Sequence, residues 1–173
     1  MSIHTKASPG GQPESAAPRR ILFVCLGNIC RSPAAEIIFN AVLEAHGRRA
    51  DFVVDSCGMG AWHVGQKPDA RMLAALQRHG YRWGGHRARQ FRRADFADFD
   101  LIIPQDASNR EDILALARSA EERARVQPMS RWFLPDCRFT EVPDPYWDGE
   151  RGFDTVVELL EEACTRLAED LLG

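Results

Sequence analysis

ILFVCLGNICRSPAAE, residues 21–36, is the stretch that decides the fold of this chain. Its first five residues, Ile21–Cys25, form an apolar run typical of a buried parallel strand. A short loop follows, and an amphipathic segment then runs to about Ala45. Ser32 before Pro33 favours a helix start, with serine as the cap and proline in the first helical position. The stretch therefore predicts a strand, a tight loop and a helix.

Strand-like and helix-like segments alternate along the rest of the chain. Apolar runs predict two more strands at 52–56 and 99–103, and the segment 131–139 is ambiguous as a fourth. Helical patterns cover 69–79, 108–125 and 153–172. Strands that alternate with helices imply right-handed crossovers. The predicted fold is α/β, a single domain with a central parallel sheet of about four strands and helices on both faces.

Length and composition narrow the class of protein. The 173 residues fit one domain at 20–173, after a tail at 1–19 that is rich in Ser, Pro, Gly and Ala. That tail lacks the apolar core of a secretion signal, so we expect a disordered tail and a cytoplasmic protein. A net charge of −3 argues against nucleic acid and against anionic membranes as partners. No apolar run approaches the ~18 residues of a membrane helix.

The five cysteines are scattered and odd in number, which argues against a disulfide framework. None of them forms the paired spacing of a zinc site. The cysteine pattern therefore argues against a zinc site, and we expect neither a metal nor a cofactor.

The loop after the first strand is the first candidate for a functional site, because ligands bind at the carboxyl ends of parallel strands. It has the pattern Cys-x5-Arg, with Cys25 at the end of the strand and Arg31 at the start of the helix. Backbone N–H groups at a helix N-terminus bind anions, and the same field stabilises a thiolate nucleophile. The planar guanidinium of Arg31 suits two oxygens of a phosphoryl group.

Three other residues of this loop fit phosphate chemistry. Ser32 can donate to the sulfur when the sulfur leaves as a thiolate, Gly27 permits close approach of the backbone, and Asn28 tolerates left-handed geometry. The alternative interpretation is a core cysteine beside a capping serine, with Arg31 on the surface.

Five motifs occur in the order found in one family. They are VCLGNICRSPAAE at 24–36, DSCGMGAWHVGQKPD at 55–69, HRARQF at 86–91, FDLIIPQDASN at 99–109 and DPYW at 144–147. In these motifs the chain, from Ile21 onward, resembles the low-molecular-weight protein tyrosine phosphatases. The resemblance implies metal-independent hydrolysis of phosphotyrosine through a phosphocysteine intermediate.

The resemblance also implies roles for single residues. Cys25 would be the nucleophile, Arg31 would bind the phosphate and Asp144 would be the general acid and base. Pro145 restricts Asp144 to extended geometry, which helps to aim its carboxyl. The other residues of the phosphate-binding loop would be Leu26, Gly27, Asn28, Ile29, Cys30 and Ser32.

Further residues would support the loop or line the substrate cleft. Ser56 and His86 would hydrogen-bond to Asn28, while Asp106 would lie near the site entrance or serve as a helix cap. Trp62 would face Tyr146 and Trp147 across an aromatic slot that favours a flat phosphotyrosine ring. Related bacterial phosphatases for phosphoarginine usually carry Thr where this chain has Ile29, so Ile29 favours tyrosine.

The resemblance implies that Cys30 is a resolving thiol for an oxidised Cys25. The alternative is that Cys30 is a small residue packed under the loop.

The partner that the resemblance implies is a phosphotyrosine-containing protein, and a bacterial tyrosine kinase is among the candidates. Inorganic phosphate, the product, would inhibit the reaction. Cys57, Met59 and Gln105 depart from the family's pattern, which bears on substrate selectivity.

The sequence also argues against two other functions. An arsenate reductase on the same scaffold needs two more cysteines close together on a mobile segment, but residues 65–136 contain none. A non-catalytic phosphate-binding or redox-sensing module would not need Cys25, Arg31 and Asp144 together.

Overall fold

β1 (Arg19–Cys25) is the middle strand of a parallel sheet in the computed structural model, which describes residues 17–173. It pairs with β2 (Phe52–Gly58) on one side and with β3 (Leu101–Pro104) on the other, in the order β2-β1-β3. Cys25 is the last residue of β1, opposite Gly58. The predicted parallel sheet is confirmed, and its central strand delivers Cys25 to the edge where ligands bind.

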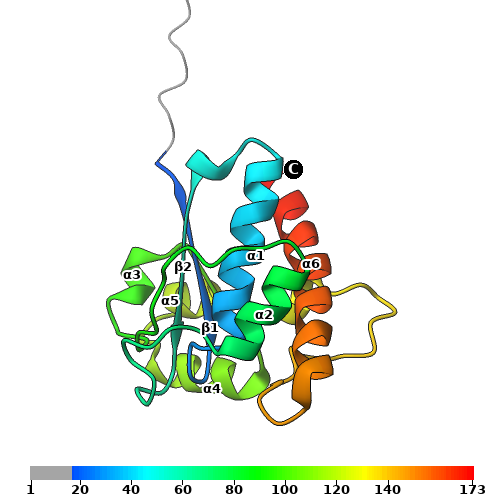
Figure 1. Ribbon diagram of the computed structural model, residues 1–173. Helices are drawn as coiled ribbons and strands as arrows, with labels where there is room; N and C mark the ends of the chain where they lie inside the picture. The colour runs from blue at the N-terminus through cyan, green and yellow to red at the C-terminus, as the bar shows by residue number, and fades with distance from the viewer. Residues whose placement is uncertain (1–16) are drawn as a thin grey trace, which may run out of the picture.

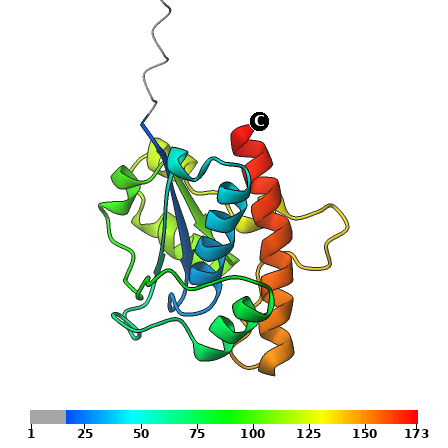
Figure 2. The ribbon, with the colours of Figure 1, turned by 45° about the horizontal axis from the view of Figure 1, so that its top comes forward.

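Helices cover both faces of this sheet (Figure 1). One face packs against α1 (Arg31–Ala45), α2 (Ala70–Arg78) and α6 (Gly149–Leu172). The other side of the sheet carries α3 (Asp95–Asp98), α4 (Ala107–Leu116) and α5 (Ala120–Ala124). Figure 2 shows α1 lying between the sheet and α6.

The alternation of side chains along β1 explains the two layers. Ile21 and Phe23 belong to the apolar cluster that contains α1 and α6, whereas Leu22 and Val24 belong to the cluster on the opposite face. Successive side chains of a strand point to opposite faces, so a strand that is apolar at every position must be covered on both.

The ambiguous segment 131–139 does not form a fourth strand, and the described residues contain three strands. A 3-10 helix, η2 (Met129–Trp132), occupies its start. Pro128 and Pro135 lack the N–H that a sheet ladder requires. Trp132 instead packs into the core, and its indole N–H donates to Asp170 of α6 at 3.1 Å.

The helix predicted over 108–125 is wrong as a single element, because it divides into α4 and α5. Ala117 is extended, with ψ 137°, and ends α4. Ser119 then caps α5 by accepting a hydrogen bond from the Glu122 amide at 3.0 Å. A serine in the middle of a helical pattern can form a cap instead of continuing the helix.

The other predicted helices and strands occur with small changes in their ends. A second 3-10 helix, η1 (Arg49–Asp51), leads into β2, and Gly80, with φ +89°, follows the end of α2. The short helix α3 was not predicted. Residues 1–16 of the predicted tail lie outside the described residues, while Arg19 already belongs to β1.

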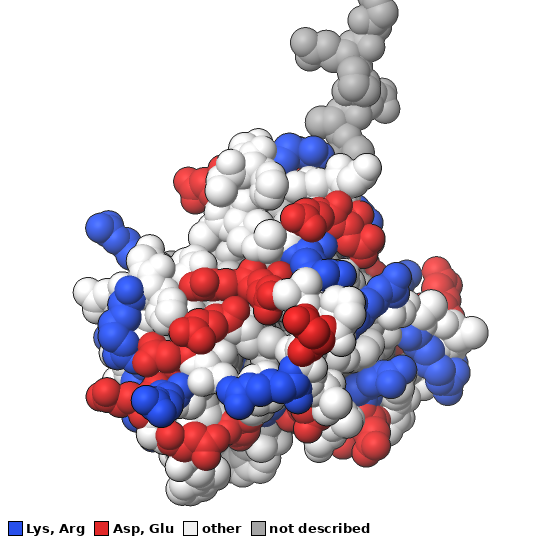
Figure 3. Space-filling view, turned by 90° about the vertical axis from the view of Figure 1, so that its right-hand side faces the viewer, with Lys and Arg blue, Asp and Glu red and all other residues white. Residues whose placement is uncertain are grey.

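The face that carries α6 and the segment 133–148 has Asp and Glu side chains interspersed with Lys and Arg (Figure 3). In the part of the chain that the structure describes, no helix is long and apolar enough to cross a bilayer.

Candidate active site

The loop between β1 and α1 curls around the sulfur of Cys25. We call residues 25–31 the phosphate loop. Asn28 has a left-handed φ of 56°, and its amide N–H donates to the Cys25 Sγ at 3.3 Å. A single left-handed residue reverses the chain and directs backbone N–H groups inward, which is the geometry of an anion site.

The segment after β2 holds the outside of the phosphate loop. The amides of Met59 and Gly60 donate to the carbonyl oxygens of Cys25 and Leu26 at 2.9 and 2.8 Å. A Cβ on Gly58 would lie 2.8 Å from the Leu26 oxygen, so only glycine permits this contact. Sequence reasoning missed Gly58, although a glycine at the end of a strand signals close backbone approach.

Ser32 does not cap α1, contrary to the expectation from the sequence. The helix already begins at Arg31, with Cys30 in the cap position, so Ser32 lies inside the first turn. Its hydroxyl oxygen lies 3.0 Å from the Cys25 Sγ and 3.2 Å from the Cys57 carbonyl oxygen. The single hydroxyl proton can therefore turn toward the sulfur when the sulfur becomes negatively charged.

The side-chain amide of Asn28 is fixed by four contacts. Its nitrogen donates to the Ser32 and Ser56 hydroxyls at 2.8 and 3.0 Å. Its oxygen accepts from the His86 Nε2 at 2.9 Å and from the Arg89 amide at 3.1 Å. The structure thus brings Ser56 and His86 to Asn28, where both contacts restrain the left-handed turn of the loop.

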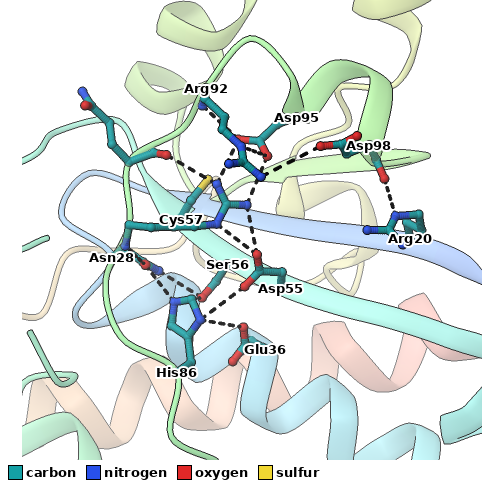
Figure 4. A network of polar contacts seen from close by, with 12 residues as sticks. Arg20, Asn28, Glu36, Asp55, Ser56, Cys57, His86, Arg92, Asp95 and Asp98 are labelled. Carbon is teal, nitrogen blue, oxygen red and sulfur yellow. Dashed lines mark hydrogen bonds and ion pairs between the residues drawn. The ribbon is translucent and has the colours of Figure 1, made fainter. Parts of the chain in front are cut away.

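His86 lies between the Asn28 amide and two carboxylates (Figure 4). Its Nδ1 lies 3.2 Å from Asp55 and 3.6 Å from Glu36. Burial by itself would lower the pKa of His86, but the hydrogen bond to Asp55 and the charge of Glu36 raise it above its ordinary value. The imidazolium form donates from both nitrogens, so it can donate to the Asn28 amide oxygen and to the Asp55 carboxylate at once.

The two carboxyl groups behind His86 titrate in opposite directions. Burial, followed by the charge of Asp55, raises the pKa of Glu36 to about 7. Burial acts in the same sense on Asp55, but hydrogen bonding to His86 and the charge of Arg89 outweigh it and lower the pKa of Asp55 to about 2. Asp55 is therefore the carboxylate that stabilises the His86 imidazolium.

Replacing Asp55 by Asn should lower the free energy of unfolding by about 2 kcal/mol at pH 7, because the folded protein lowers the pKa of this carboxyl from 3.8 to about 2. Because the pKa of Asp55 is lower in the folded protein, its carboxylate stabilises the fold at pH values above the unfolded-state pKa of 3.8. This contribution is lost as the pH falls through the folded-state pKa of about 2. Urea unfolding of both proteins at pH 7 and pH 3 should show a smaller difference at pH 3. A difference that is unchanged or larger at pH 3 would contradict the assignment, and exposed Asp51→Asn is the control.

Glu36, Asp55 and His86 also form, within residues 17–173, the one group whose potential metal-ligating atoms all lie within 4.8 Å of one another. These atoms already pair with each other. None of the three residues lines the cavity described below.

The guanidinium of Arg31 is buried and held from two sides. Its Nη1 donates to the Asp106 Oδ2 at 2.6 Å and to the Val142 carbonyl oxygen at 3.1 Å. Burial alone would lower the pKa of Arg31, but the Cys25 sulfur and the Asp106 hydrogen bond raise it. The other carboxylate oxygen of Asp106 accepts from the Asn109 amide at 2.8 Å, so Asp106 both caps α4 and orients Arg31.

Asp144 lies on the opposite side of Arg31. Its Oδ2 is 4.0 Å from the Arg31 Nη2, and its Oδ1 accepts from the Tyr146 amide at 3.0 Å. The Asp144 side chain is 47% exposed, against 17% for Asp106. A carboxyl that exchanges protons with a substrate must be reachable, so geometry separates these two acids.

One cavity of about 330 Å³ joins these groups. It is lined by Cys25, Leu26, Gly27, Ile29, Cys30, Arg31, Trp62, His63, Asp144, Tyr146 and Trp147. Trp62 and Trp147 are 70% and 85% exposed, and Tyr146 and Trp147 meet edge to face with their ring centroids 4.7 Å apart.

Five of the residues predicted from the sequence do not line the cavity but support the phosphate loop or Arg31 by hydrogen bonds, and the others line it. The five are Asn28, Ser32, Ser56, His86 and Asp106. His63 was missed, because a histidine in a polar loop carries no signal of its own. A Cβ on Gly27 would lie 3.0 Å from its ring.

Comparison with known sequences gives consistent matches. The family described as "Low molecular weight phosphotyrosine protein phosphatase" matches residues 20–172. A Schizosaccharomyces pombe protein with that same name is 42% identical, over 82% of this chain and 90% of the relative. A low molecular weight protein-tyrosine-phosphatase of Streptomyces coelicolor is 40% identical, over 86% of this chain and 90% of the relative.

Solved structures agree with the sequence matches. A protein tyrosine phosphatase from Entamoeba histolytica superposes with a TM-score of 0.85 and 36% identity, over 89% of this chain and 97% of that one. Wzb from Vibrio vulnificus, in complex with benzylphosphonate, superposes with a TM-score of 0.76 and 25% identity, over 88% and 98% of the two chains.

These findings define a phosphoric monoester hydrolase with a cysteine at the end of its first strand, where the phosphate loop begins. The chain belongs to the low molecular weight phosphotyrosine protein phosphatase family, whose members are metal-independent protein-tyrosine phosphatases. The family and the activity predicted from the sequence are confirmed, and the arsenate reductase and phosphate-sensor alternatives are not favoured. The roles of single residues stay predictions.

Proposed function

We propose that Cys25, Arg31 and Asp144 carry out the two chemical steps of phosphotyrosine hydrolysis. The observation that supports this proposal is their convergence on one cavity from β1, α1 and the segment 143–148. We call 143–148 the acid loop. The three groups supply a nucleophile, a binder for phosphoryl oxygens and a proton donor, and an aryl phosphate ester needs all three.

In the first step, the Cys25 thiolate attacks phosphorus and the bond to the tyrosine oxygen breaks. Asp144 gives its proton to that oxygen, so tyrosine leaves as the neutral phenol. Arg31 binds two of the phosphoryl oxygens with its planar fork of donors. The products are a phosphocysteine and an Asp144 carboxylate.

In the second step, the Asp144 carboxylate takes a proton from a water molecule that attacks the phosphocysteine. The sulfur–phosphorus bond breaks, inorganic phosphate forms, and the thiolate and the protonated acid are restored. The Ser32 hydroxyl, 3.0 Å from the sulfur, can donate to the departing thiolate. Product phosphate is then an inhibitor, because it fits the same loop.

The walls of the cavity favour an aromatic phosphate ester. The aromatic side chains of Trp62, Tyr146 and Trp147 line the cavity together with Ile29 of the phosphate loop. A flat ring stacks between aromatic walls, whereas the shorter side chain of phosphoserine leaves its phosphate farther from the buried sulfur. The benzylphosphonate complex of the Vibrio vulnificus relative supports this preference.

The direct test compares a phosphotyrosine peptide with the same peptide carrying phosphoserine, each with and without EDTA. We expect rapid hydrolysis of phosphotyrosine only, no effect of EDTA, and competitive inhibition by inorganic phosphate. Comparable rates on phosphoserine would contradict the aromatic cleft as the basis of selectivity.

The physiological partner we propose is a phosphotyrosine-bearing protein, and a bacterial tyrosine kinase is the first class to test. A Cys25→Ser protein can retain such a partner in a pull-down, since it binds phosphate but does not turn over.

The five cysteines, all in the described residues, are free thiols. Free thiols fit a reducing compartment, and we propose that the protein works in the cytoplasm.

We further propose that Cys30 protects Cys25 from irreversible oxidation. Both residues line the same cavity and both are free thiols. Burial, with the charges of Asp69 and Cys25, raises the pKa of the Cys30 thiol, so Cys30 is protonated while Cys25 is the nucleophile. A sulfenic acid on Cys25 would release water on capture by the Cys30 thiol and leave a disulfide.

Replacing Cys30 by Ser should leave catalysis largely intact but make inactivation by peroxide harder to reverse. The parent protein should recover with dithiothreitol, and peptide mapping should find a Cys25–Cys30 disulfide. Cys137→Ser, which changes a thiol outside the cavity, is the control. Equal recovery of the Cys30→Ser protein and the parent would leave Cys30 as a packing residue.

A further inference from the structure

Arg71, in the first turn of α2, contacts two separate segments. Its Nε and Nη2 donate to the two carboxylate oxygens of Asp69 at 3.1 and 2.9 Å. Its Nη1 donates to the Tyr146 carbonyl oxygen at 3.1 Å, in the acid loop. The guanidinium thus joins the N-cap of α2 to the segment that carries Asp144.

Each end of this contact continues to a group of the active site. The Asp69 amide donates to the Ile29 carbonyl oxygen of the phosphate loop at 2.7 Å. At the other end, the Tyr146 amide donates to the Asp144 Oδ1 at 3.0 Å. The peptide units on either side of Tyr146 are therefore held by Arg71 and by Asp144.

Two aromatic rings fix the plane of the Arg71 guanidinium. Its central carbon lies 5.0 Å from the centroid of the Tyr146 ring and 4.7 Å from that of Phe153. Phe153 is fully buried at the start of α6, so this side of the contact is rigid. A planar guanidinium can stack on aromatic rings and use its fork of donors together, which an ammonium cannot do.

The acid loop has few other restraints of this kind. In residues 17–173, no other hydrogen bond reaches the acid loop from outside 143–148 and α6. Arg31 approaches Asp144 only at 4.0 Å. Among the described residues, Arg71 is therefore the side chain from outside this loop and α6 that hydrogen-bonds to it.

We propose that Arg71 is a positioning residue that holds the acid loop over the phosphate loop and so aims Asp144 at the leaving-group oxygen. The proposal rests on the assignment of Asp144 as the general acid. It adds a residue that touches neither the substrate nor the reacting atoms and that acts through the Tyr146 peptide. Displacement of a catalytic group by about 1 Å can cost as much as ~10²-fold in rate.

The test compares kcat/KM for phenyl phosphate with kcat/KM for an activated ester, nitrophenyl phosphate, because kcat/KM reports the step in which the ester bond breaks. Arg71→Ala should lose about tenfold on phenyl phosphate, a fraction of the ~10²–10⁴ that a general acid contributes, and no more than about twofold on the activated ester. Arg71→Lys keeps the positive charge but loses the planar set of guanidinium donors. On a logarithmic scale of kcat/KM, it should recover less than half of what Arg71→Ala loses on phenyl phosphate.

Arg78→Ala is the matched control. Arg78 lies on the same helix, has similar exposure and also joins α2 to α6, but its side chain donates to Asp154 and not to the acid loop. We expect this variant to keep the parent kinetics on both esters. Asp69→Asn keeps an oxygen that can cap α2 but weakens the paired hydrogen bonds with the Arg71 guanidinium. Like Arg71→Ala, it should lower kcat/KM more for phenyl phosphate than for nitrophenyl phosphate. Thermal unfolding of each variant checks that the fold is retained.

A double-mutant comparison separates positioning from other effects. If Arg71 acts through Asp144, then adding Arg71→Ala to an Asp144→Asn protein should cost no more than about a further twofold on phenyl phosphate. A full additional tenfold loss would overturn the proposal. An equal loss from Arg71→Ala on both esters, or full rescue by lysine, would also overturn it. Those results would leave Asp144 as the acid, whereas an Asp144→Asn protein without leaving-group dependence would overturn the acid assignment itself.

Discussion

Replacing Cys25 by Ser should reduce phosphotyrosine turnover to below about 1% of the parent, because a serine hydroxyl is a far weaker nucleophile than a thiolate at neutral pH. Cys25 is 3% exposed, and its sulfur lies at the base of a loop whose Asn28 amide donates to it. A serine hydroxyl in the same place stays protonated at neutral pH and is a poor nucleophile.

Phosphate binding should largely survive this substitution. The loop binds an anion with backbone N–H groups and with Arg31, and the substitution changes none of these. Calorimetric titration of the Cys25→Ser protein with inorganic phosphate should therefore give a dissociation constant near that of the parent. Cys137→Ser, which changes a half-buried thiol outside the cavity, should keep normal activity. Residual activity above about 1% in Cys25→Ser would exclude a phosphocysteine mechanism.

Asp144→Asn should lower kcat/KM for phenyl phosphate by roughly 10²–10⁴, the usual contribution of a general acid. Asparagine keeps the Oδ1 acceptor for the Tyr146 amide, so the geometry of the acid loop should be preserved while the transferable proton is lost. The loss should shrink for nitrophenyl phosphate, because a stable phenolate needs little protonation as it leaves.

The measurement is the dependence of kcat/KM on the leaving group in a series of substituted phenyl phosphates. Asp148→Asn is a suitable control, since Asp148 lies in the same loop but outside the cavity. An equal loss across the series would mean that Asp144 is structural. The acid would then be sought at Asp106, although its bonds to Arg31 and Asn109 occupy both of its oxygens.

Local sequence predicted the elements that depend on neighbouring residues. The apolar run of β1 and the glycine that follows α2 are short-range signals, and both elements occur as expected. The start of α1 was placed too late because Ser32-Pro33 has the form of a cap. The serine hydroxyl instead contacts the Cys25 sulfur, and this contact depends on the curl of the loop.

The sequence by itself determined the three strands and the helices α1, α2 and α6, the position of Cys25 at the end of a buried strand and the family to which the chain belongs. These follow from hydrogen bonding and side-chain periodicity within a few residues, or from motifs that can be read directly. Only the tertiary structure decided why β2 must end in Gly58, which of Asp106 and Asp144 is open to the cavity, and that Arg71 connects the acid loop to α2. Tyr146 is 75 residues from Arg71, and such a contact is set by the packing of α2 against α6, which no local pattern encodes.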